Sequence, residues 1–142
     1  MDNVVSQQIP HDSEAEKAVL GAVFLDPEAI IDASDILQPD DFYEHANRIV
    51  FQAMLNISDR EEVIDPVTLQ DELKKNNQVD DIGGIAYVTE LSMATPTAAH
   101  LTYYAKIVKR KAILRNLIST SQRIIQNAIE GSDDVTDILD DA

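Results

Sequence analysis

The chain has neither glycine nor proline from Ala98 to Glu130, a stretch of 33 residues. Glycine and proline are the residues that interrupt helices most strongly, and a helix of this length would extend for about 50 Å. The composition agrees, because four glycines, five prolines and 5% aromatic residues among 142 are few for a sandwich or a barrel. We therefore expect an all-α fold that contains one long helix.

Short amphipathic helices are expected before the long one. Ser13 and Glu16 have the spacing of a capping box, and the Asp-Pro pairs at 26–27 and 65–66 are typical helix starts. Apolar residues recur at helical spacing after each of these signals. The expected helices cover residues 13–25, 27–37, 44–57, 66–74 and 85–93.

These signals divide the chain into four parts. Residues 1–9 are polar and aperiodic and predict a flexible arm, while residues 10–95 predict a compact, multi-helix globular head. Residues 96–130 form the long helix, the first arm of a helical hairpin, and Gly131 is suited to end it. Residues 131–142 begin the second hairpin helix and stop after little more than two turns. We expect the chain to be a piece of a longer protein.

Apolar side chains cover about half of the circumference of the long helix, with Ala112 and Asn116 assigned to the opposite, polar side. A helix that packs on one core needs an apolar stripe of little more than 100°. The surplus favours contact with the returning helix or with another chain, although the core of a monomeric bundle is the alternative. The residues expected at chain–chain contacts are Ile107, Leu114, Leu117, Ile118, Ile124 and Ile125.

The net charge of −15 is unevenly distributed. Residues 1–100 hold 20 acidic and 5 basic side chains, residues 101–129 hold 6 basic and no acidic ones, and residues 130–142 hold 6 acidic ones. The basic stretch 106–123 supports an alternative function, a helical nucleic-acid-binding module. However, its side chains do not share one helix face, aromatic residues do not alternate with them, and the acidic remainder repels polyanions. We therefore expect little or no direct nucleic-acid binding by this chain.

The sequence contains no recognisable catalytic or cofactor motif. Its four glycines cannot form a phosphate-binding loop, and the lack of cysteine excludes disulfides, zinc fingers and iron–sulfur clusters. No apolar run approaches 18 residues. These observations indicate a soluble, cytoplasmic protein without a cofactor or metal of its own.

A small carboxylate enzyme is a third hypothesis, but the titratable residues give it little support. The aspartate pairs at 40–41, 80–81 and 133–134 stand at turns or helix starts, where capping accounts for them. The histidines lie in separate segments without a second ligand at helical spacing. They are His11, His45 and His100.

Several short strings occur in order over about 130 residues. They are PHDSEAE at 10–16, DP at 26–27, DFY at 41–43, ID and VTL within 64–69, GG at 83–84, PTAA at 96–99 and YYA at 103–105. Their succession resembles the N-terminal domain of the bacterial replicative DNA helicase, the DnaB family. Two positions depart from the pattern, because Asn47 replaces an expected histidine and His100 an expected asparagine. We expect these departures to affect local hydrogen bonds only.

The resemblance implies a globular helical head followed by a helical hairpin. It implies a non-catalytic collar on a hexameric ring, often a trimer of dimers, that recruits primase, with a helicase loader as a further candidate partner. ATP and Mg²⁺ would bind a separate motor domain of the parent protein. Exposed apolar residues tend to mark partner surfaces, so candidates for primase contact are Tyr87, Ile118 and Ile124.

Overall fold

The computed structural model describes residues 9–131 and 134–141, and every regular element in these ranges is helical. This confirms the all-α prediction. The α-helices and the short 3₁₀ helices, labelled η, follow one another as α2 (Ser13–Leu25), α3 (Ala29–Ile36), η1 (Pro39–Asp41), α4 (His45–Asp59), α5 (Pro66–Lys75), η2 (Asp80–Ile82), α6 (Ile85–Ser92), α7 (Leu101–Glu130) and α8 (Val135–Asp141).

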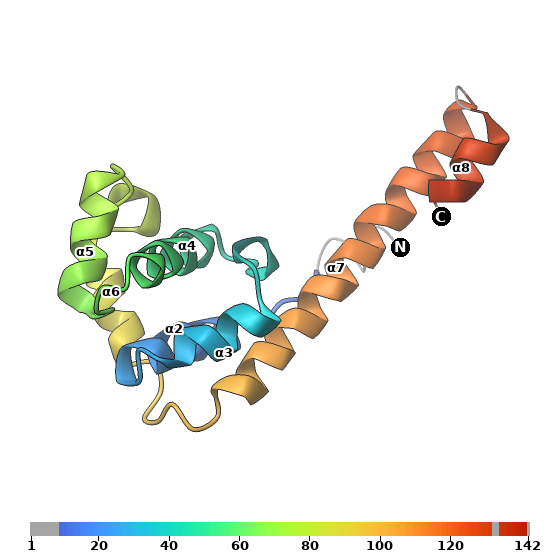
Figure 1. Ribbon diagram of the computed structural model, residues 1–142. Helices are drawn as coiled ribbons and strands as arrows, with labels where there is room; N and C mark the ends of the chain where they lie inside the picture. The colour runs from blue at the N-terminus through green and yellow to red at the C-terminus, as the bar shows by residue number, and fades with distance from the viewer. Residues whose placement is uncertain (1–8, 132–133, 142) are drawn as a thin grey trace.

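Helices α2 to α6 form the head, and α7 runs along α2 and α3 before it projects well beyond them (Figure 1). Helix α8 folds back against the far end of α7. The core lies inside the head, where Phe42 packs against Phe51 with ring centroids 5.0 Å apart. None of the described helices has both the length and the apolar character that a membrane crossing requires.

Two predicted segments fall partly outside the described residues. The expected flexible arm, residues 1–9, is described only at Ile9. Residues 132–133 and 142 of the expected second hairpin helix are also outside, so the predicted pair at 133–134 is described only at Asp134. Asp134 accepts a hydrogen bond from the backbone N–H of Thr136 at 2.7 Å, as a residue just before a helix should.

The predicted capping box at the start of α2 is wrong. Asp12 is the N-cap, with extended backbone angles, and its carboxylate accepts a hydrogen bond from the Ala15 N–H at 3.0 Å. Ser13 is already helical and donates its hydroxyl to Glu44 instead. Because the helix begins one residue earlier than the box requires, Glu16 is displaced from the capping position and its side chain turns into the head.

Only one of the two Asp-Pro pairs starts a helix. Asp65 caps α5 by accepting from the Thr68 N–H at 2.8 Å, and the Thr68 hydroxyl accepts from the Asp65 N–H. Asp26 instead ends α2, because its N–H donates to the Ala22 carbonyl at 2.9 Å. The next two residues form a turn, and α3 begins only at Ala29.

The long helix begins at Leu101 rather than at residue 96. Pro96 disfavours helical backbone in the residue before it, and Thr95 and Thr97 bond locally. The Thr95 hydroxyl donates to the Thr97 carbonyl at 3.0 Å, and the Thr97 hydroxyl accepts from the Ala99 N–H at 3.1 Å. The helix ends at Gly131 in the left-handed region, at φ 59°, as the sequence predicted.

Two alanines are among the side chains that face the head from α7. Its buried residues are Leu101, Ala105, Val108 and Ala112. The assignment of Ala112 to the polar side of the helix is therefore wrong. That assignment followed the large apolar residues, whereas small residues let the backbone of α7 approach α2 and α3 closely.

Candidate functional site

The side of α7 that points away from the head carries exposed large apolar residues. At 100° per residue they span an arc that is centred opposite the face that holds Ala105 and Ala112. Leu117 and Ile125 are each 58% exposed. The others on this side are Tyr103, Ile113, Leu114 and Ile129. We call this set, from Tyr103 to Ile129, the outer face of α7.

Helix α8 carries further exposed apolar residues. A bidentate ion pair holds it against α7, because the guanidinium of Arg123 donates to both oxygens of Asp141, at 2.7 and 2.9 Å. The same hydrogen bonds lower the pKa of the Asp141 carboxyl. Val135 and Leu139 of α8 remain largely exposed. Exposed apolar residues gathered in this way are typical of protein–protein contact sites.

The six residues predicted at chain–chain contacts occupy different environments. Leu114, Leu117 and Ile125 belong to the outer face of α7. Ile118 and Ile124 are partly buried on the same helix. Ile107 is also partly buried, and it packs against the core of the head.

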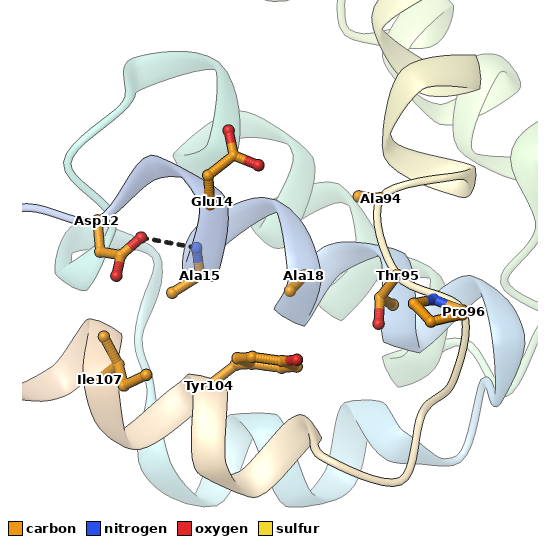
Figure 2. Close-up of a pocket in the computed structure, with 9 residues that line it drawn as sticks. All are labelled: Asp12, Glu14, Ala15, Ala18, Ala94, Thr95, Pro96, Tyr104 and Ile107. Atoms are coloured by element: carbon orange, nitrogen blue, oxygen red, sulfur yellow. Dashed lines mark hydrogen bonds between the residues drawn. The ribbon is translucent and has the colours of Figure 1, made fainter.

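Ile107 lies beside a hollow of about 260 Å³ between α7, the start of α2 and the loop before α7 (Figure 2). Figure 2 shows Tyr104 and Ile107 directed from α7 toward α2, with Pro96 at the other end of the hollow. Ile107 therefore contributes to the joint between head and helix.

Tyr87, a predicted primase contact, is partly buried on α6. Its hydroxyl donates to the side-chain carbonyl of Asn47. Burial, together with the nearby carboxylates of Glu90, Glu16 and Glu44, raises the pKa of Tyr87 to about 12. The three predicted primase contacts therefore come from two parts of the chain, the head for Tyr87 and the long helix for the two isoleucines.

Sequence reasoning missed a buried polar network around Glu16. The carboxylate, in a residue only 1% exposed, accepts from the backbone N–H groups of Tyr43 at 2.7 Å and Glu44 at 3.2 Å. It also accepts from the amide of Asn47 at 2.9 Å. Asn47, the departure from the family pattern, thus donates to Glu16 and accepts from Tyr87. Nothing in the local spacing of Glu16 indicates partners that lie 27 and 31 residues away.

Three basic side chains of α7 are bonded to other groups of the same chain. Lys109 lies 3.0 Å from the Asp41 carboxylate, and Arg123 pairs with Asp141. Arg115 donates to the backbone carbonyls of Pro10 at 2.8 Å and Asp41 at 2.7 Å. A nucleic-acid-binding module would need these charges free for phosphates, so the geometry does not favour that alternative.

His11 and His100 each pack against a tyrosine ring, as histidines with a structural role do. The ring of His11 stacks on Tyr43 with centroids 4.3 Å apart, and His100 meets Tyr104 edge-on. In residues 9–131 and 134–141 no group of three or more histidine and carboxylate side chains is placed to bind a metal ion.

Comparison with known proteins gives consistent matches. The family model described as "DnaB-like helicase N terminal domain" matches residues 8–110. The replicative DNA helicase DnaB of Geobacillus stearothermophilus is 48% identical over 143 residues, which include all of this chain. The chain spans only 32% of the length of that relative.

Solved structures agree with the sequence comparison. The N-terminal domain of DnaB helicase from Mycobacterium tuberculosis is 39% identical, covers 94% of each chain and has a TM-score of 0.89. The N-terminal domain of DnaB helicase from Helicobacter pylori, described with its interactions with primase, has a TM-score of 0.72. It is 23% identical and covers 90% of this chain and 98% of its own, so it supports the fold alone.

Proposed function

Because this chain belongs to the DnaB-like helicase N-terminal domain family, we propose that it is the non-catalytic collar domain of a hexameric replicative DNA helicase. Its task is to hold copies of the protein together during DNA replication, as dimers and as a trimer of dimers. The outer face of α7 is the observation that carries this proposal. A single chain leaves these large apolar side chains in water, and a second chain would bury them.

The position of the outer face supports assembly. The distal part of α7 and α8 projects beyond the head (Figure 1), so a partner helix can reach it without displacing the head. Leu117 and Ile125 of α7 and Leu139 of α8 offer apolar contacts to such a partner. Two such hairpins packed together would form a small helical bundle, the usual way to cover helices of this type.

Primase recruitment is the second part of the proposal. The Helicobacter pylori relative is described with its interactions with primase. In this chain Ile118 and Ile124 lie next to the exposed Leu117 and Ile125 and can contribute to such a surface. Tyr87 can contribute only its ring, because its hydroxyl is bonded to Asn47. A helicase loader is a further candidate partner.

The motor activity is assigned elsewhere in the parent protein. The relatives are named replicative DNA helicases, and this chain covers about a third of the Geobacillus one. We assign ATP, Mg²⁺ and strand separation to the part of such a protein that this chain does not match, and we place the whole protein in the cytoplasm. This chain then acts in assembly and recruitment only.

Assembly is tested by changing Leu117→Asp together with Ile125→Asp. Both side chains are exposed, so the head should stay folded, while two charges at the contact should separate the copies. In sedimentation velocity we expect the unmodified chain to exceed its monomer mass of 15.7 kDa and the variant to approach it. The matched control is Asn116→Asp with Gln126→Asp, which adds the same charge away from the outer face.

Two results would contradict the assembly proposal. One is an unmodified chain that sediments as a monomer at all accessible concentrations. The other is a control variant that loses as much mass as the Leu117 and Ile125 variant, because net charge rather than the outer face would then be responsible.

A further inference from the structure

A groove on the head lies apart from the surfaces discussed above. It is a hollow of about 710 Å³ between residues 26–31, the turn before α3 and the first residues of that helix, and residues 58–64, the end of α4 and the segment after it. The turn between α2 and α3 is at the end of the head far from the projecting end of α7 (Figure 1). We call the hollow the acidic groove.

The floor and the rim of the acidic groove are apolar. Ile30 and Ile64 form its floor and are almost completely buried. Ile31 on α3 is 60% exposed and Val63 on the opposite segment is 66% exposed, and both line the hollow. Two segments far apart in sequence thus present exposed aliphatic side chains to the same space, which is typical of a contact site for an apolar partner group.

Carboxylates surround this apolar surface. Asp26, Glu28, Glu61 and Glu62 line the groove, and no basic side chain does. Arg60 neutralises part of the charge, because its guanidinium lies 3.1 Å from Glu62. Among the described residues Glu28 and Glu61 have no ion-pair partner. The groove is therefore a negatively charged site that would attract a cationic segment.

The backbone at Glu61 is held in an unfavourable conformation. Its φ is 58°, in the left-handed region that glycine adopts more easily. The turn is fixed by hydrogen bonds from the Glu61 N–H to the Ser58 carbonyl at 2.9 Å and from the Glu62 N–H to the Ile57 carbonyl at 3.1 Å. A glycine would relieve the strain but remove a carboxylate from the groove, and strained residues of this kind concentrate at functional sites.

We infer that the acidic groove docks a basic amphipathic segment of a partner protein. One or two aliphatic side chains of the segment would pack against Ile31 and Val63, and lysine or arginine side chains would pair with Glu28 and Glu61. Phosphate-bearing partners are disfavoured by the same carboxylates. The site is separate from the outer face of α7, so this inference and the proposed function can fail independently.

A second copy of this chain is a poorer occupant. The basic residues of this chain are concentrated on α7, and Lys109, Arg115 and Arg123 are engaged within the chain. The neighbouring apolar residues of α7 serve the proposed assembly. A segment from a different protein can supply both its charges and its aliphatic side chains without breaking these contacts.

The test uses a fluorescein-labelled peptide with two copies of the heptad Leu-Lys-Lys-Leu-Leu-Lys-Leu, titrated by fluorescence anisotropy. Two groove variants are compared with the unmodified chain, Ile31→Ser with Val63→Ser and Glu28→Gln with Glu61→Gln. Each should raise the Kd roughly tenfold, because central apolar contacts and desolvated charges dominate binding. All four side chains are exposed, so circular dichroism should show an unchanged fold.

Matched controls remove the same kinds of side chain, apolar and acidic, at exposed positions outside the groove. Val67→Ser with Met93→Ser removes exposed apolar side chains, and Asp71→Asn with Asp81→Asn removes exposed charges. Both controls should leave the Kd within about twofold of the unmodified chain. The same peptide with glutamate in place of lysine should not bind.

Amide chemical shifts in two-dimensional NMR spectra locate the peptide. We expect the shifts in residues 26–31 and 58–64. The inference is overturned by a peptide that does not bind, by shifts confined to α7 and α8, or by controls that weaken binding as much as the groove variants do. It is also overturned if the groove amides shift when the protein alone is concentrated, since a second copy would then be the occupant.

Discussion

The carboxylate of Glu16 joins two helices that are distant in sequence. One oxygen accepts from the backbone N–H of Tyr43, and the other accepts from the N–H of Glu44 and the amide of Asn47. These groups surround the start of α4, which has no side-chain cap of its own. A residue on α2 thus supplies the negative charge that the N-terminus of α4 favours.

We predict that Glu16→Ala destabilises the domain by about 3 kcal/mol, because it leaves buried donors without an acceptor. The measurement is the free energy of unfolding in urea. Glu14→Ala removes an exposed carboxylate from the same first turn and should change that energy by less than about 0.5 kcal/mol. Similar losses in both variants would show that Glu16 acts only through the charge of the first turn.

Among the helices, α7 has one side that packs against the head and another that is exposed. Small residues such as Ala105 and Ala112 meet the head, whereas Leu117 and Ile125 on the outer face remain exposed. The helix is therefore amphipathic in an unusual sense, because its larger apolar side is directed away from its own core. This arrangement lets the backbone of α7 lie close to the head while the outer face stays available.

We predict that Ala112→Leu costs about 1–3 kcal/mol of stability, since a larger side chain must push α7 away from the head. Ala128→Leu is the matched control, because Ala128 is exposed on the same helix and should tolerate the change. Thermal unfolding at low protein concentration measures both. If Ala112→Leu is neutral, the close approach of α7 to the head is not a packing constraint.

At the scale of the whole molecule, Arg115 ties three parts of the chain together where α7 leaves the head. It donates to the carbonyls of Pro10 and Asp41. Its guanidinium also lies over the ring of Tyr43, 5.5 Å from the centroid, and that ring stacks on His11. The segment before α2, η1 and the long helix are therefore fixed relative to one another by one side chain.

We predict that Arg115→Ala accelerates hydrogen exchange of the amides in residues 40–43 by roughly tenfold or more, because about 2 kcal/mol of charge-assisted hydrogen bonding is lost. Arg110→Ala is the control, since Arg110 is exposed on the same helix. Exchange rates that change equally in the two variants would mean that Arg115 contributes only its positive charge.

Much of the fold could be predicted because its signals are local. The long helix ends at Gly131 and α5 starts at Asp65 as expected, since caps and breakers act within about one turn of the residue that carries them. The family was identified from short strings in order, and the match over residues 8–110 confirms it. The acidic groove was not predicted, because Ile31 and Val63 meet only after the chain has folded.

Composition and periodicity are enough to predict the helical class, the uneven charge and the excess of apolar residues on the long helix. Tertiary structure alone decided that Ala112 faces the head and that Glu16 serves α4 rather than α2. The physical reason is that periodicity reveals which residues share a face of a helix. Which face is buried, and which distant group a buried carboxylate meets, depends on the shape of the surface that packs against it.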